Sequence, residues 1–96
     1  MNPDLKKAIE GYCSKLPYIN ESSQPHDDNR LYSISYYLVK TKERFDTDFF
    51  KQELRKNSKA SLDKLNNVQF EEFAENRIDE IQRGSYIIER ISNLIF

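Results

Sequence analysis

The sequence predicts an all-α fold, a small helical bundle of four to six helices. Three observations favour it. Apolar residues recur at helical spacing along most of the chain, helix-capping residues precede these stretches, and no apolar segment has a second strand to pair with. The 96 residues are 38% hydrophobic and 32% charged, which fits one domain, 1–96, with a core just large enough to fold alone. The expected helices lie near 3–16, 30–43, 47–56, 59–66 and 68–95.

The first helix has three favourable start residues: Asn2 as its cap, Pro3 at its first position and Asp4 in its first turn. Its apolar side chains, Cys13 among them, share one face, and Pro17 ends it. We therefore expect Cys13 to be a small core residue and not a nucleophile.

Residues 17–29 are predicted to form a polar loop, because prolines and a run of polar residues interrupt the helical pattern. The loop holds the only histidine, His26, beside Asp27 and Asp28. Neighbouring residues on a loop rarely converge on one ion, so a solvated loop with a helix cap is favoured over a metal site.

The segment 30–43 fits two secondary structures. Its apolar and polar residues alternate as in a strand, yet Leu31, Ile34 and Leu38 also repeat at helical spacing. We predict a helix, because a lone strand leaves its backbone groups without partners. The next helix is expected to start at Asp46, with Phe45 packed against Phe50.

The C-terminal helix carries the longest apolar period and begins at Asn66 or Asn67. At 1.5 Å per residue it spans about 43 Å, whereas the radius of gyration of such a chain is about 13 Å. Two solutions follow: a second subunit covers the overhang, or the helix kinks or breaks at Gly84, which is the solution we favour. Ala74, Ile81, Ile88 and Ile95 are spaced by seven, but packing within one bundle is favoured over a coiled-coil dimer.

Composition and residue types favour a non-enzymatic protein-interaction module, such as an adaptor, inhibitor, immunity-type protein or small assembly subunit. The expected partner is another protein or a second copy, with a homodimer expected. Arg77 lies within an apolar arc of the C-terminal helix. Either its aliphatic carbons pack on that arc while its guanidinium pairs with a carboxylate of the chain, or the guanidinium binds an anionic partner. The candidate partner-binding residues are Tyr32, Tyr36, Tyr37, Arg77, Ile87, Ile91, Leu94 and Phe96, with Ile88 and Ile95 beside them.

The alternative is a small nucleic-acid-binding regulator. Residues 51–64 fit a helix, a turn and a second helix, and their basic side chains are placed to meet phosphates. The residues are Lys51, Arg55, Lys56 and Lys59. A formal net charge of -1 and a pI near 5.8 oppose this alternative, since no overall basic field attracts nucleic acid.

Catalysis and cofactors are not expected. The chain has one histidine, one cysteine and two glycines, which leaves no phosphate-binding loop, no tetrahedral zinc set and no disulfide. The N-terminal residues lack the apolar segment of a signal peptide, and no run is long enough for a spanning helix. We expect a cytoplasmic protein without a cofactor, a metal, a small-molecule substrate or a membrane partner.

Overall fold

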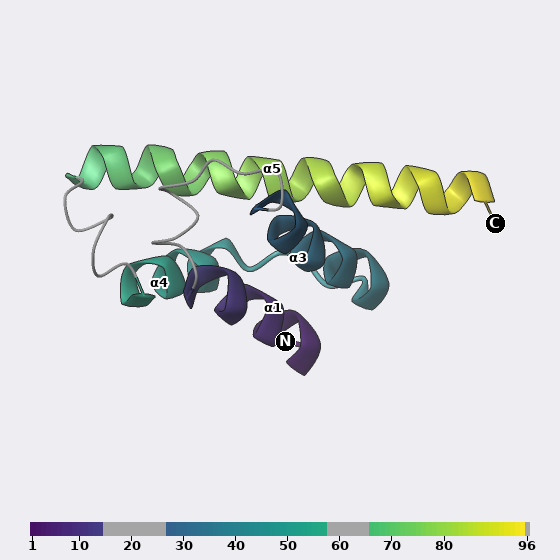
Figure 1. The fold of residues 1–96 in the computed structure, drawn as a ribbon, viewed down its shortest axis with the longest axis horizontal. Helices are drawn as coiled ribbons and strands as arrows, with labels where there is room; N and C mark the ends of the chain where they lie inside the picture. The colour runs from purple at the N-terminus through teal and green to yellow at the C-terminus, as the bar shows by residue number, and fades with distance from the viewer. Residues whose placement is uncertain (15–26, 58–65, 96) are drawn as a thin grey trace.

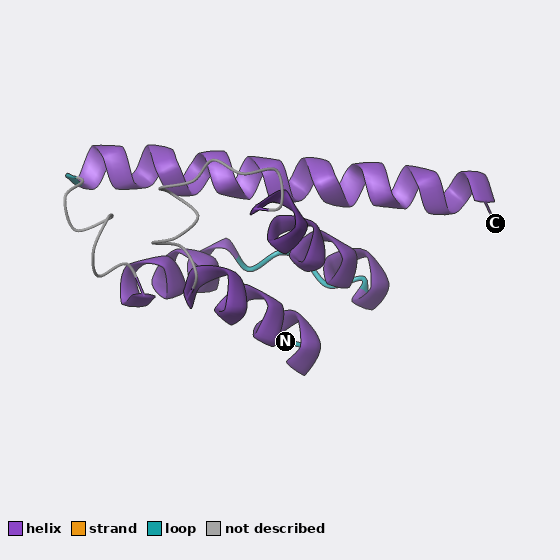
Figure 2. Cartoon of the chain, viewed as in Figure 1, coloured by secondary structure: helices purple, strands orange, loops and turns teal. Residues whose placement is uncertain are grey.

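A computed structural model describes residues 1–14, 27–57 and 66–95, which form four helices and contain no strand (Figures 1 and 2). The helices are α1 (Pro3–Ser14), α3 (Asp27–Thr41), α4 (Thr47–Asn57) and α5 (Asn67–Ile95). The all-α prediction and the long C-terminal helix are confirmed, and the ambiguous segment 30–43 is helical as far as Thr41. The predicted helix near 59–66 lies, apart from Asn66, outside the described residues.

Several predicted boundaries are corrected. α3 begins at Asp27, so residues 27–29 belong to a helix and not to the predicted loop; residues 17–26 of that loop lie outside the described residues. α3 ends at Thr41, earlier than predicted, while residues 15 and 16 of the predicted first helix lie outside the described residues. Lys42, directly after α3, has a φ of 57°, the left-handed geometry that commonly ends a helix.

Side-chain caps start α1 and α4 as the sequence predicts. Asn2 Oδ1 accepts a hydrogen bond from the Asp4 backbone N–H at 2.8 Å, and Asp46 Oδ1 accepts one from the Phe49 N–H at 3.0 Å. Each cap satisfies a backbone donor that has no partner within its helix. Substituting such a cap by alanine typically costs about 1 kcal/mol.

A reciprocal pair of hydrogen bonds starts α5. Asn66 Oδ1 accepts from the Gln69 backbone N–H at 2.8 Å, and Gln69 Oε1 accepts from the Asn66 N–H at 3.1 Å. From there α5 is one continuous helix to Ile95, and it passes through Gly84 (Figure 1). The favoured break at Gly84 is therefore absent, and a kink there is not confirmed.

The four helices share one apolar core. α5 packs mainly on α3 and also on α4, while α1 packs on α3 and α4 (Figure 1). The Phe45 and Phe50 rings meet edge to face with centroids 5.5 Å apart, as the sequence predicts for the start of α4. The buried apolar residues are Leu5, Ile9, Tyr12, Cys13, Leu31, Ile34, Leu38, Phe50, Leu54, Phe70, Ala74, Ile78 and Ile81.

The core ends before α5 does. Ile81 is the last fully buried apolar residue of α5 among those described, and Ile88 is only half-buried. Figure 1 shows the yellow C-terminal end of α5 extending past the other helices. The overhang expected from the length of this helix is therefore present.

Candidate interaction surface

An apolar surface remains open where α5 passes beyond its supporting helices. Ile87, Ile91 and Leu94 are 46%, 50% and 83% exposed, and their spacing places them on one side of α5. Tyr32 and Tyr36 of α3 are 44% and 49% exposed and lie one helical turn apart. We call these five residues the apolar face.

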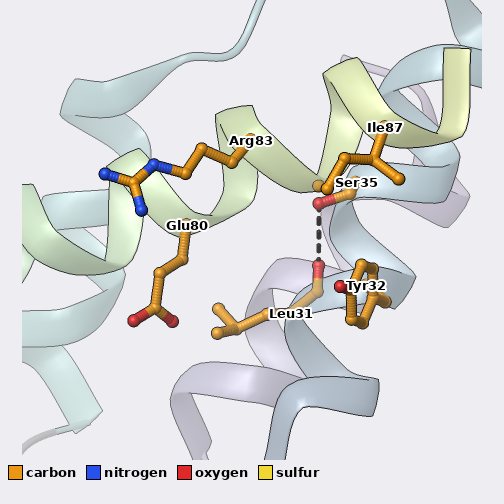
Figure 3. A pocket seen from close by; sticks show the side chains of 7 residues that line it. Leu31, Tyr32, Ser35, Glu80, Arg83 and Ile87 are labelled. Carbon is orange, nitrogen blue, oxygen red and sulfur yellow. Dashed lines mark hydrogen bonds between the residues drawn. The ribbon is translucent and has the colours of Figure 1, made fainter. Parts of the chain in front are cut away.

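A cavity joins the two halves of the apolar face, since Tyr32 and Ile87 both line it. Its volume is about 320 Å³. Figure 3 shows Leu31, Tyr32 and Ser35 on its α3 side and Glu80, Arg83 and Ile87 on its α5 side. The lining residues are Leu31, Tyr32, Ser35, Glu80, Arg83, Gly84 and Ile87.

Close packing of α3 on α5 forms the inner end of this cavity. The buried Ser35 hydroxyl donates to the carbonyl oxygens of Ile81, at 2.8 Å, and Leu31, at 3.2 Å. A β-carbon at Gly84 would lie 2.7 Å from Ser35 Oγ, a distance that real contacts do not reach. Gly84 therefore permits the helices to approach, which explains a glycine inside a continuous helix.

Sequence reasoning did not identify Ser35 and Gly84 as part of this surface. Both are small residues on helix faces that otherwise carry large apolar side chains, with Ser35 between Ile34 and Leu38 and Gly84 between Ile81 and Ile88. The presence of a small residue at each of these positions could be seen in the sequence. Which small residues face each other depends on where the two helices cross.

Tyr37 differs from the other two tyrosines of α3. It is half-buried and packs against the core, whereas Tyr36 is exposed. The two rings meet edge to face with centroids 5.4 Å apart, and Lys40 Nζ lies 5.8 Å from the Tyr36 ring centroid. Tyr37 therefore supports Tyr36 from within the fold and lies outside the apolar face.

Arg77 also lies outside the apolar face. Its guanidinium pairs with Glu80 at 3.1 Å and lies 5.4 Å from the Phe73 ring centroid. It also lies beside Tyr12, where burial raises the pKa of the tyrosine hydroxyl and the positive charge of Arg77 offsets part of that rise. Glu80 therefore meets the charge of Arg77 within the chain, while Arg77 Nε is buried without a hydrogen-bond partner among the described residues.

The described residues do not cover the rest of the predicted surface. Phe96 lies outside them, and the side chain of Ile95 is likewise not described. Within α5, Ala74 and Ile81 are fully buried in this chain. They are therefore closed to a coiled-coil partner.

The predicted phosphate-binding residues meet an acidic stretch of α5. Lys51 pairs with Glu75 at 2.8 Å and Glu71 at 3.1 Å, and Arg55 pairs with Glu71 at 3.4 Å. Hydrogen bonds to Glu75 and Glu71 raise the pKa of Lys51, and Lys51 lowers the pKa of Glu71. Lys56 is exposed, and Lys59 lies outside the described residues.

Cys13 is fully buried in the core, and burial raises its pKa to about 12. In residues 1–14, 27–57 and 66–95 no three His, Cys, Asp or Glu side chains are grouped to hold a metal ion. His26 falls outside those ranges.

None of the helices that the structure describes combines the length and apolar character needed to cross a membrane. Comparison with known protein families, curated proteins and solved structures finds no match to this chain.

Proposed function

We propose that this chain is a non-enzymatic protein-interaction module that binds a protein partner through the apolar face. An adaptor, inhibitor, immunity-type protein or small assembly subunit fits this role. The observation that carries the proposal is the exposure of Ile87, Ile91 and Leu94 on the end of α5 that extends past its supporting helices. A partner that covers this end removes apolar surface from water that the chain itself leaves open.

The energetics favour a partner of this kind. Burying a fully exposed Ile or Leu side chain is worth about 1.5–3 kcal/mol. Ile87 and Ile91 are already half covered, so each gains about half of that free energy, whereas Leu94 gains most of it. Tyr32 and Tyr36 add two rings with polar ends, a residue type enriched in protein interfaces. The cavity beside Tyr32 adds a hollow into which a partner side chain fits.

Nucleic-acid binding is the weaker proposal. Lys51 and Arg55 pair with acidic residues of α5, so phosphate contact requires breaking ion pairs within the chain. The formal net charge of -1 adds no long-range attraction for a polyanion. Of the four predicted basic residues, Lys56 alone is both described and without such an acidic partner on α5.

We also propose that the chain is cytoplasmic, and Cys13 supports both this location and the absence of an enzymatic role. Its thiol is buried and protonated at neutral pH, so it does not act as an accessible nucleophile. A lone unpaired cysteine also fits a reducing compartment. The buried thiol and the single cysteine support a non-enzymatic, cytoplasmic protein, whereas the apolar face supports binding of a protein partner.

A photo-crosslinking amino acid tests the proposal in the source cells. Placed at Leu94, it is expected to form adducts with a protein. The matched control is the same amino acid at Glu89, which is exposed on the opposite side of the same overhang. Protein adducts at position 94 but not at 89 support the proposal. Equal yields at both positions, or none at 94, contradict it.

A further inference from the structure

We infer that the partner is a second copy of this chain, bound antiparallel through the C-terminal end of α5. This inference rests on the proposed function and adds the occupant of the apolar face. In the inferred dimer, a two-fold axis crosses α5 near the level of Glu89. Leu94 of each copy then enters the cavity between α3 and α5 of the other.

The spacing along α5 makes this pairing self-complementary. Gly84 and Leu94 are separated by about 15 Å along the helix at 1.5 Å per residue. If two antiparallel α5 helices cross at the level of Glu89, midway between these residues, Leu94 lies at the level of the partner's Gly84. Ile87 then lies opposite the partner's Ile91. A two-fold interface requires such reciprocity, because each contact occurs twice with the roles exchanged.

The cavity is suited to an aliphatic side chain. Three of the polar side chains that line it have partners within the chain: Ser35 bonds to backbone carbonyls, Glu80 pairs with Arg77, and Arg83 pairs with Asp79 at 2.8 Å. The other polar side-chain group of the lining is the hydroxyl of Tyr32, which ends an apolar ring. Leu94, at 83% the most exposed large apolar residue described, makes a matching projection.

The available area suits a small interface. The five side chains of the apolar face are between 44% and 83% exposed, which is roughly 100 Å² per residue and about 500 Å² in all. Two such faces together bury about 1,000 Å², the lower end of the range for specific interfaces. The apolar face alone therefore suits a small dimer interface.

The charges around the face are few and of both signs. The overhanging part of α5 carries Arg83, Glu89 and Arg90, and Arg83 is paired with Asp79 within the chain. Two such surfaces meet with little net repulsion, and neither attracts a strongly charged protein. A parallel coiled coil along the residues spaced by seven is excluded, because Ala74 and Ile81 are buried within the chain.

Sedimentation of the purified chain tests the inference. Wild type is expected to show a concentration-dependent monomer–dimer equilibrium. Leu94→Asp should weaken dimerisation by at least about a hundredfold, because the axis places the substitution in the interface twice. The matched control, Gln52→Asp, adds the same charge at an exposed site on α4 and should leave the equilibrium unchanged. Unchanged circular dichroism shows that both variants remain folded.

Disulfide cross-linking tests the orientation. Mixing Tyr32→Cys with Leu94→Cys should give a covalent heterodimer, because Leu94 enters a cavity that Tyr32 lines. Leu94→Cys alone should not cross-link, since the antiparallel dimer places the two copies of position 94 about 15 Å apart along the helices. Rapid cross-linking of Leu94→Cys alone would show parallel packing and overturn the antiparallel dimer.

The two proposals fail in different ways. A wild-type chain that stays monomeric at every concentration overturns the inference of a second copy. In that case photo-adducts at Leu94 with a different protein would still support the proposed function. If the chain is monomeric and position 94 forms no protein adduct, both proposals are wrong.

Discussion

Ser35 of α3 lies directly against Gly84 of α5, where a β-carbon at position 84 would be 2.7 Å from Ser35 Oγ. The same hydroxyl donates to the Ile81 carbonyl oxygen at 2.8 Å, so it bridges the two helices that line the cavity. A glycine within a helix costs about 0.5–1 kcal/mol relative to alanine. The contact with Ser35 gives a reason for that cost.

Gly84→Ala is therefore expected to destabilise the chain although alanine favours helix. The added methyl group clashes with buried Ser35, and overpacking of this kind typically costs about 1–3 kcal/mol. The matched control is Gly11→Ala in α1, where an added β-carbon meets nothing within 4 Å. That change should stabilise by about 0.5–1 kcal/mol. Urea unfolding of the two variants measures the contrast, and stabilisation by both would contradict the packing role of Gly84.

The clash at Gly84 should depend on Ser35. Ser35→Gly removes both atoms of the serine side chain that approach position 84, so Gly84→Ala should cost less in that background. We expect a coupling of about 0.5–3 kcal/mol in the double-mutant cycle, as for residues in direct contact. Additive free energies of unfolding would show that the two positions do not meet.

Local features of the fold were predictable from the sequence. Caps at Asn2, Asp46 and Asn66 act within one turn of the helix they start, so short-range residue patterns indicate them correctly. Leu31, Ile34 and Leu38 repeat at helical spacing and are all buried in α3, although the choice of helix over strand rested on the lack of a second strand to pair with.

Features that depend on the packing of distant segments were not predictable. Gly84 fitted a helix end equally well, because the crossing with Ser35 brings together residues far apart in sequence. Lys51 resembled a phosphate contact until the fold placed Glu71 and Glu75 beside it. The break favoured at Gly84 was wrong, and at both positions the tertiary neighbours explain the residue where its local sequence does not.

The apolar face was predictable in part. Ile87, Ile91 and Leu94 were expected at an interface or in the core, and their exposure excludes the core within this chain. Tyr32 and Tyr37 were expected together, yet the rotation of α3 about its axis exposes the first and turns the second toward the core. The spacing of residues in the sequence shows which of them share a helix face. It does not show whether that face is turned toward the core or toward solvent.

Alkaline pH should destabilise the fold through Cys13. Burial raises the pKa of its thiol to about 12 from an ordinary value of 9.0, so the unfolded chain loses this proton at lower pH than the folded chain does. The resulting stabilisation is complete below pH 9 and is lost as the pH rises toward about 12. The raised pKa of the Tyr12 hydroxyl acts in the same direction.

Cys13→Ala isolates the thiol contribution. Its free energy of unfolding should fall less steeply than that of wild type between pH 9 and about pH 12, where the thiol is ionised in the unfolded chain but not in the folded chain. Urea unfolding at several pH values provides the measurement. Parallel curves for the two proteins would show that the thiol is not held protonated by burial.

The paired basic residues should make the chain a poor ligand for nucleic acid. We expect no measurable binding of duplex or single-stranded DNA or RNA at low salt, because Lys51 and Arg55 are paired with acids of α5. Fluorescence anisotropy measures this. If binding does occur and Lys56→Glu lowers its salt slope by about one unit, the nucleic-acid alternative replaces the proposed function.

Leu94→Asp should leave the folded monomer intact. Leu94 is 83% exposed, and substitutions at such positions usually change stability by no more than about 0.5 kcal/mol. The control on the same helix is Ile81→Asp, which places a charge in the core and should unfold the chain. Urea unfolding of Leu94→Asp and wild type, compared at concentrations where wild type is monomeric, measures the difference. If Leu94→Asp unfolds the monomer as Ile81→Asp does, Leu94 belongs to the core, and the apolar face is not available to any partner.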